Sequence, residues 1–165
     1  MKAFCSVVDM VNEWVGRVAA WLVIPMCLLV TYDVTLRYIF NQPTIWSWDI
    51  NVQLLGASAA LGGGFTLLHK GHIGVDVLLL RLSPQKQLIV KLLTSLFFFL
   101  GVGVLVWQAG LEAWVSAQQL EVDYTYFAPP LYPIKGTIFL GFLLLFLQGI
   151  AELIRDITAV LSENR

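Results

Sequence analysis

His69, His72 and Asp76 are the residues best suited to bind a metal ion, and they follow directly after a long apolar stretch. Spacings of three and four residues can place such side chains on one face of a helix, and imidazole and carboxylate groups are common zinc ligands. Gly71 and Gly74 interrupt that helix, and no further ligand lies nearby in the sequence. The cluster therefore does not predict a metal site, and no cofactor is expected.

Asp33 and Arg37 form the second pair that has a recognisable chemistry. They are spaced i, i+4 with the acid first, which is the favourable order for an ion pair on a helix. An exposed pair of this kind contributes only about 0.3–0.5 kcal/mol. The alternative is that Arg37 points into a protein interface or toward a lipid phosphate.

Catalytic constellations are not found in the apolar stretches. No nucleophile stands beside a base, no glycine loop suits a phosphate, and no carboxylates are paired. We therefore do not expect an enzyme. A complete secondary transporter usually has repeats, broken helices and ion-coordinating groups at mid-membrane. The polar residues here are scattered and better suited to holding helices together: Thr31, Gln53, Ser58, Thr66, Thr94, Ser95, Gln108 and Gln148.

The elements that must position these residues are membrane-spanning helices. Of the 165 residues, 58% are hydrophobic and only 13% charged, and the mean hydropathy is +0.78. A helix needs about 20 apolar residues to cross the hydrocarbon core. The sequence predicts an all-α integral membrane protein with a single domain over residues 1–165. Its four spans are expected at about Trp14–Leu36, Ile50–Leu68, Leu92–Leu111 and Leu131–Ala151.

Charge placement orients these spans. Of the ten Lys and Arg residues, only Arg37 and Lys135 fall on the side that holds the connections between spans one and two and between spans three and four. Because Lys and Arg are enriched in cytoplasmic loops, both termini are predicted to be cytoplasmic. The basic residues are spread between apolar blocks, so nucleic acid is not an expected partner.

Smaller features refine this arrangement. Gly56, Ala60 and Gly64 recur every four residues and predict a face on which another helix packs closely, either within this chain or in a second protein. Ser83 and Pro84 are typical of a helix start. The helix would run to near residue 118 and, at roughly 50 Å, would tilt or project from the membrane. Cys5 and Cys27 are expected to be free thiols, and the first span to be retained rather than cleaved.

Three short stretches resemble one transporter family. They are Asp33-Val-Thr-Leu-Arg37-Tyr-Ile-Phe-Asn41, Trp46-Ser-Trp48-Asp49 and Gly71-His72-Ile-Gly-Val-Asp76. In their order and separation they are similar to the small membrane subunit, of the DctQ type, of tripartite ATP-independent periplasmic (TRAP) transporters. The resemblance extends over nearly the whole chain in the number and spacing of spans. Gly74 departs from it, since a basic residue is often expected there.

The resemblance implies a non-catalytic scaffold in a bacterial inner membrane. Its partner would be a large elevator-type membrane subunit that carries the sodium and substrate sites. A periplasmic substrate-binding protein would deliver an organic acid, such as a keto acid or an aromatic acid.

The resemblance also bears on the connections between spans. Trp46, Trp48 and Asp49, near Arg37 and Asn41, would anchor a short interfacial helical segment in loop one or touch a partner. A second such segment is expected in loop two, where His72 and Asp76 are candidate interface or structural residues and Asp76 would pack or orient a helix.

Two other readings stay open. One is a membrane anchor for a redox complex, which would need histidines within the spans. The other is a small self-associating membrane protein, in which the glycine face of span two would join copies of the chain.

Overall fold

The computed structural model describes residues 2–71 and 84–163, and these residues are almost entirely helical. The helices are α1 (Lys2–Trp21), α2 (Val23–Ile39), α3 (Ser47–Leu68), α5 (Pro84–Gln119) and α6 (Tyr132–Glu163). Within the described part of the chain, four helical stretches are long and apolar enough to cross a membrane: Ala3–Ile39, Ser47–Leu68, Leu93–Gln119 and Tyr132–Thr158. The predicted all-α, four-span class is confirmed.

The first helical stretch extends beyond the predicted span, because α1 and α2 follow each other with a break only at Leu22. Pro25 explains this break. It has no N–H to donate to the carbonyl of Trp21, so the helical ladder is interrupted there. Instead, the Leu22 N–H bonds to the Ala19 carbonyl at 3.2 Å. Helix α1 begins at Lys2, before the predicted start of the span at Trp14.

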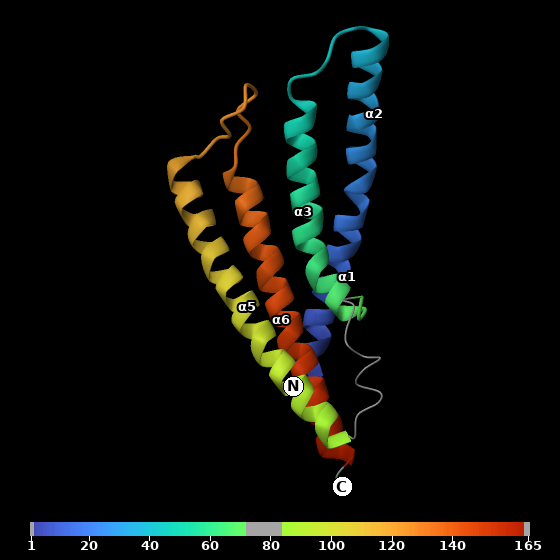
Figure 1. Ribbon diagram of the computed structural model, residues 1–165, viewed down its shortest axis with the longest axis vertical. Helices are drawn as coiled ribbons and strands as arrows, with labels where there is room; N and C mark the ends of the chain where they lie inside the picture. The colour runs from blue at the N-terminus through green and yellow to red at the C-terminus, as the bar shows by residue number, and fades with distance from the viewer. Residues whose placement is uncertain (1, 72–83, 164–165) are drawn as a thin grey trace.

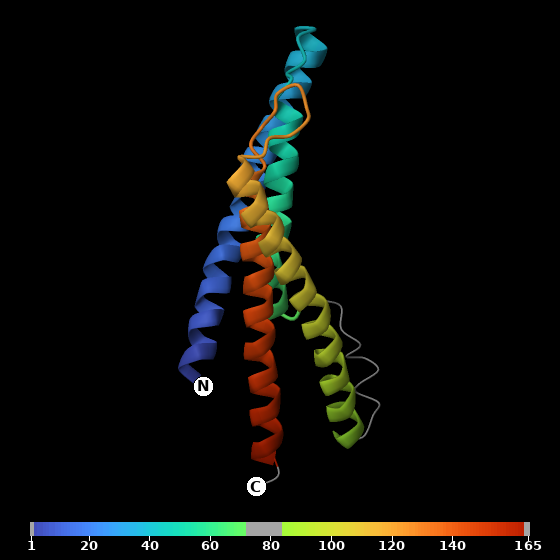
Figure 2. The same cartoon turned by 90° about the vertical axis from the view of Figure 1, so that its left-hand side faces the viewer.

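The helices form an open layer and not a closed bundle. Judged by which helices touch, the order across the layer is α2, α3, α6, α5. Helix α1 crosses both α3 and α6 (Figure 1). Helix α6 therefore lies at the centre and contacts α1, α3 and α5. The view in Figure 2 shows α5 and α1 diverging from α6 toward one end of the molecule.

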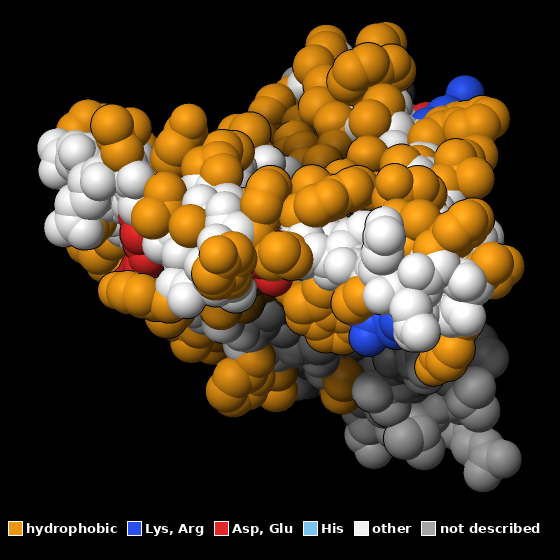
Figure 3. All heavy atoms as spheres, turned by 90° about the horizontal axis from the view of Figure 1, so that it is seen from above, with side chains coloured by type: hydrophobic (Ala, Val, Ile, Leu, Met, Phe, Trp, Pro, Cys, Tyr) orange, Lys and Arg blue, Asp and Glu red, His pale blue; other side chains and the backbone are white. Residues whose placement is uncertain are grey.

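The core of this layer is small. Among the described residues the buried hydrophobic side chains are Cys5, Val8, Ala19, Val102 and Ala151. Most large apolar side chains are exposed, and hydrophobic atoms cover much of the view along the long axis (Figure 3). In water this surface would be unstable, so it must face lipid or another protein.

Both chain termini lie toward one end of the molecule, which we call the terminal end (Figure 1). Two connections lie at the other end, which we call the loop end. They are loop one, residues 40–46, and loop three, residues 120–131. Helix α5 has 36 residues, which confirms the expected long third helix. The expected segment in loop two, with His72 and Asp76, lies outside the described residues.

Candidate functional site

Asp33 organises the loop end of α2. Its Oδ2 accepts a hydrogen bond from Arg37 Nη2 at 2.8 Å. Its Oδ1 accepts bonds from the Thr44 backbone N–H, at 3.0 Å, and from the Thr44 hydroxyl. The Asp33 side chain is only 16% exposed, whereas that of Arg37 is 52% exposed. Asp33 thus fastens loop one to α2, and the guanidinium of Arg37 stays accessible to a partner.

Loop one has no helix of its own, so the prediction of an interfacial helical segment in this loop is wrong. Asn41 has a positive φ of 56°, which ends α2, and Asn tolerates this conformation better than most residues. Pro43 lacks a backbone donor. The Thr44 backbone N–H bonds to the Asp33 side chain, and α3 begins at Ser47.

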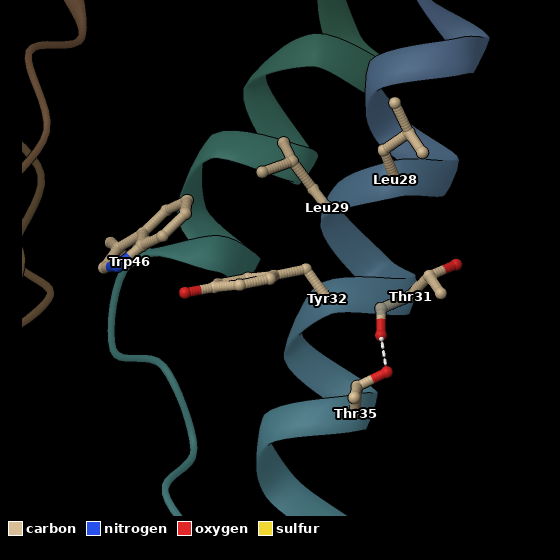
Figure 4. A pocket seen from close by; sticks show the side chains of 6 residues that line it. All are labelled: Leu28, Leu29, Thr31, Tyr32, Thr35 and Trp46. Atoms are coloured by element: carbon tan, nitrogen blue, oxygen red, sulfur yellow. Dashed lines mark hydrogen bonds between the residues drawn. The ribbon is translucent and has the colours of Figure 1, made fainter.

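Trp46 packs beside Tyr32 where α2 and α3 meet, with 6.2 Å between the ring centroids. The Ser47 hydroxyl bonds to the Leu29 carbonyl at 3.3 Å and helps to hold the two helices together. An open groove lies between these helices (Figure 4), and its wall is largely apolar. It is lined by Leu28, Leu29, Thr31, Tyr32, Thr35 and Trp46.

The two threonines do not make this groove polar. The Thr31 hydroxyl donates to the Cys27 carbonyl at 2.8 Å, and the Thr35 hydroxyl donates to the Thr31 carbonyl at 2.7 Å (Figure 4). Their donors are therefore occupied within α2. The groove therefore offers mainly apolar contact to whatever covers it.

Several large apolar side chains surround loop one and form what we call the apolar tip. Its members are Ile39, Phe40, Ile45 and Trp48, which are exposed by 60% or more. Trp48 thus points away from the chain, while Trp46 packs against Tyr32. The two tryptophans of the Trp-Ser-Trp stretch have different surroundings.

Asp49 connects α3 to loop three. Its Oδ2 accepts a hydrogen bond from the Thr125 hydroxyl at 2.8 Å. One turn later, Gln53 Nε2 donates to the Pro130 carbonyl at 3.3 Å. The structure therefore brings Asp49 together with loop three.

Lys135, in the first turn of α6, joins three elements at the loop end. Its ammonium lies 2.6 Å from Glu121 Oε2 in loop three and 3.4 Å from Glu112 Oε2 on α5. The hydrogen bond from Lys135 holds the pKa of the Glu121 carboxyl below its ordinary value. The ion pairs fix the ends of α5 and α6 relative to loop three.

The small residues of α3 face α6. A Cβ on Gly56 would meet Ile134, and the backbone of Ala60 lies so close to α6 that a Cβ on Gly141 would be 2.5 Å from the Ala60 carbonyl oxygen. A Cβ on Gly64 would stand 2.0 Å from Asn12 Oδ1 and 3.4 Å from the Leu144 carbonyl carbon. This face therefore packs against helices of the same chain.

Asn12 and Gln148 form a buried amide pair near the terminal end, and both side chains are completely buried. Asn12 Nδ2 donates to Gln148 Oε1 at 2.8 Å, and Gln148 Nε2 donates to Asp9 Oδ1 at 3.0 Å. Arg155 bonds to the other Asp9 oxygen and, at 2.6 Å, to Glu152. We call Asp9, Asn12, Gln148 and Arg155 the terminal clasp, because they hold α1 against α6.

His69 packs against neighbouring side chains, whereas His72 and Asp76 lie outside the described residues. Its Nε2 lies 3.4 Å from Glu13, and its ring lies 4.2 Å from the Phe65 ring, centroid to centroid. The described residues contain no group of three potential ligands that could hold a metal ion.

A family model for the DctQ component of tripartite ATP-independent periplasmic transporters matches residues 26–159 of the chain. This is most of the sequence and includes loop one, α3, α5, loop three and nearly all of α6. The chain belongs to the DctQ family. No curated protein matches it in a direct sequence comparison.

The DctQ component is the small membrane subunit of a TRAP transporter, and family members work with a large membrane subunit and a substrate-binding protein. Together with its four spans, this makes the chain a multi-pass protein of the bacterial inner membrane. The matched segment begins within α2, so most of the first span, with Asp9 and Asn12, lies outside it.

Sequence reasoning missed the terminal clasp in this DctQ component. Asp9 and Asn12 lie before the predicted first span, so they were not considered as partners of a span. Arg155 entered the sequence analysis only in the count of basic residues that orients the spans. Gln148 was expected to hold helices together, but its partner is 136 residues away in the sequence. A heptad-like row of Cys5, Val8 and Asn12 on the buried side of α1 was the available signal.

Proposed function

We propose that this DctQ component is a non-catalytic scaffold of a sodium-coupled transporter for organic acids. In this proposal it forms a heterodimer with a large membrane subunit, which carries the sodium and substrate sites and moves its transport domain like an elevator. A periplasmic substrate-binding protein delivers the acid to the outer face of the pair. The loop end then faces the periplasm, and both termini face the cytoplasm.

The observation that carries this proposal is the open layer. Four spans arranged side by side have two wide apolar faces and little interior. Such a layer gives a partner a large surface, and its described residues bury few side chains between the helices. Several polar side chains within its spans bond inside the chain, as Ser58 does to the Ala19 carbonyl and Thr66 to the Gly62 carbonyl.

The apolar tip and the α2–α3 groove suit a permanent partner. Permanent interfaces are more hydrophobic than transient ones and are enriched in aromatic residues. Trp48 and Phe40 provide such side chains, and the guanidinium of Arg37, at the same end of α2 as Phe40, is exposed. We assign this surface to the large subunit, with Arg37 supplying a polar contact.

Co-purification and transport together test the proposal. The small subunit, tagged and extracted in mild detergent, should bring down a large multi-span partner. Proteoliposomes that contain both subunits should take up substrate when sodium and the binding protein are supplied, and those with the large subunit alone should not. Full uptake by the large subunit alone would contradict a scaffold role.

Arg37→Ala is the variant that tests the assigned surface. It should reduce recovery of the large subunit several-fold while leaving membrane insertion intact, since the ion pair itself contributes less than 1 kcal/mol. Arg17→Ala is the matched control, because Arg17 forms the same kind of pair, with Glu13, away from this surface. Equal recovery for both variants would remove Arg37 from the interface, and a homo-oligomer without a large subunit would contradict the proposal itself.

A further inference from the structure

Loop three has a fixed backbone despite its lack of helix. Val122 and Pro130 form an antiparallel bridge. The Asp123 N–H donates to the Pro129 carbonyl at 2.9 Å, and the Leu131 N–H donates to the Glu121 carbonyl at 2.8 Å. These bonds give the loop the form of a short hairpin whose base is closed. Figure 1 shows it rising beyond the adjoining ends of α5 and α6.

Two further bonds hold the turn of this hairpin. The Ala128 N–H donates to the Thr125 carbonyl at 3.1 Å, and the Thr125 hydroxyl is bound by Asp49 on α3. Between and beside these attachments, Tyr124 is 98% exposed and Tyr126 92% exposed. The loop thus presents two tyrosine side chains on a backbone that is already ordered.

An ordered loop with exposed tyrosines has the properties of a protein-binding element. Tyrosine is enriched at interfaces and among the residues whose truncation weakens binding most. It offers a large contact area with few rotatable bonds, and a backbone fixed before binding lowers the entropic cost of association. Neither tyrosine contributes a ring contact within the described part of the chain.

The charge of loop three argues against lipid as the binding partner. Residues 120–131 contain Glu121 and Asp123 but no Lys or Arg, and Asp49 lies beside them. Lys135 neutralises Glu121, while Asp123 Oδ1 accepts only the backbone N–H of Tyr124, at 2.7 Å, among the described bonds. An acidic loop is repelled by anionic headgroups, whereas a basic protein surface complements it.

We propose that loop three docks the soluble substrate-binding protein, through Tyr124 and Tyr126, on a basic surface of that protein. This inference rests on the proposed function, which places the loop end in the periplasm. The two surfaces of the loop end, the apolar tip and loop three, differ as surfaces for a permanent and a transient partner do. The apolar tip suits a permanent membrane partner, and the acidic, tyrosine-bearing hairpin suits a partner that binds and leaves.

The test uses proteoliposomes that contain both membrane subunits, with binding protein titrated outside. Replacing both tyrosines, Tyr124→Ser with Tyr126→Ser, should raise the binding-protein concentration for half-maximal uptake by at least about tenfold. The rate at saturating binding protein should not change. Trp114→Leu on α5 is the control, because it removes an exposed aromatic side chain, 67% exposed, without touching the loop. It should leave both quantities unchanged.

Three results would overturn the inference or its foundation, and they differ. An unchanged half-maximal concentration in the double variant shows that loop three does not dock the binding protein. Loss of the large subunit during purification of this variant shows that the loop belongs to the interface between the membrane subunits. If wild-type uptake does not require the small subunit at all, the proposed function itself fails.

Asp123→Asn tests the charge separately. The amide oxygen can still accept the Tyr124 N–H, so the hairpin is kept while one negative charge is removed. The half-maximal concentration should rise several-fold at low ionic strength, and the difference should disappear at high salt, where exposed charges are screened. An identical salt dependence for wild type and variant would contradict a basic docking surface.

Discussion

Gly64 lets α1 approach α3 so closely that even a methyl group would collide with Asn12. A Cβ at position 64 would lie 2.0 Å from Asn12 Oδ1, whereas a Cβ at Gly62 would have no neighbour within 4 Å. We therefore expect Gly64→Ala to destabilise the protein by about 1–3 kcal/mol, as overpacked sites do. Gly62→Ala, the matched control, should be neutral or slightly stabilising, since alanine favours helix.

The measurement is the melting temperature of the purified protein in detergent, followed by size exclusion after heating. Equal melting temperatures for the two alanine variants would show that α1 does not lie on Gly64 as described.

Glu121 predicts a pH effect whose sign follows from its ion pair. Lys135 lowers the pKa of the folded Glu121 carboxyl below the ordinary 4.5 of an unfolded chain. The pair therefore stabilises the protein above about pH 4.5, and this contribution is lost as the pH falls through the lower folded pKa. Glu121→Gln should abolish that part of the acid sensitivity.

Melting temperatures of wild type and Glu121→Gln between pH 3 and pH 7 test this effect. The wild type should be more stable at neutral pH, and the two curves should converge in acid. Parallel curves across the range would show that Glu121 is not paired in the folded protein.

At the scale of elements, the terminal clasp predicts that α1 and α6 are energetically coupled. Asp9→Asn and Arg155→Gln each remove one side of the ion pair, so the double variant should lose less than the sum of the single losses. Because both side chains are partly exposed, the coupling energy should be about 1 kcal/mol.

Glu13→Gln combined with Arg155→Gln is the control, since Glu13 pairs with Arg17 and His69 instead. That combination should be additive in a thermal unfolding assay. Additivity in the Asp9 cycle as well would rule out the clasp.

The spans were predictable because apolar length is a local property. The uncharged stretches located α3, α5 and α6, and Ser83 with Pro84 located the start of α5. The helical stretch that contains the first predicted span begins earlier, at Ala3. The charges of Asp9, Glu13 and Arg17 kept residues 2–17 out of the predicted span, and each of these charges is paired with another side chain in the structure.

The candidate sites were predictable only where the partners are close in sequence. The Asp33–Arg37 pair follows from helical spacing, and the structure contains it. The bonds from Thr44 to Asp33 and from Thr125 to Asp49 depend on where the loops fold back, over 11 and 76 residues respectively. No periodicity in the sequence reports such contacts.

For the molecule as a whole, the positive-inside rule predicts that both termini are cytoplasmic and that the loop end is periplasmic. Reporter fusions test this orientation. A reporter that fluoresces only in the cytoplasm should be active when fused to the C-terminus. A phosphatase that folds only in the periplasm should be active when inserted in loop three. Fusion of each reporter at the other position is the control and should be silent. The reverse pattern would place the loop end in the cytoplasm and remove the basis for docking a periplasmic protein there.

The two cations of α6 have a consequence for depth in the membrane. Lys135 is held by Glu112 and Glu121 at one end of the helix, and Arg155 by Asp9 and Glu152 at the other. They are about 20 residues apart, so they lie roughly 30 Å from each other along the axis, which is about the thickness of the hydrocarbon core. Helix α6 can therefore stand nearly upright and resist vertical displacement, because sinking or rising would drag one charged cluster into hydrocarbon. We therefore expect α6 to keep a constant depth in the membrane.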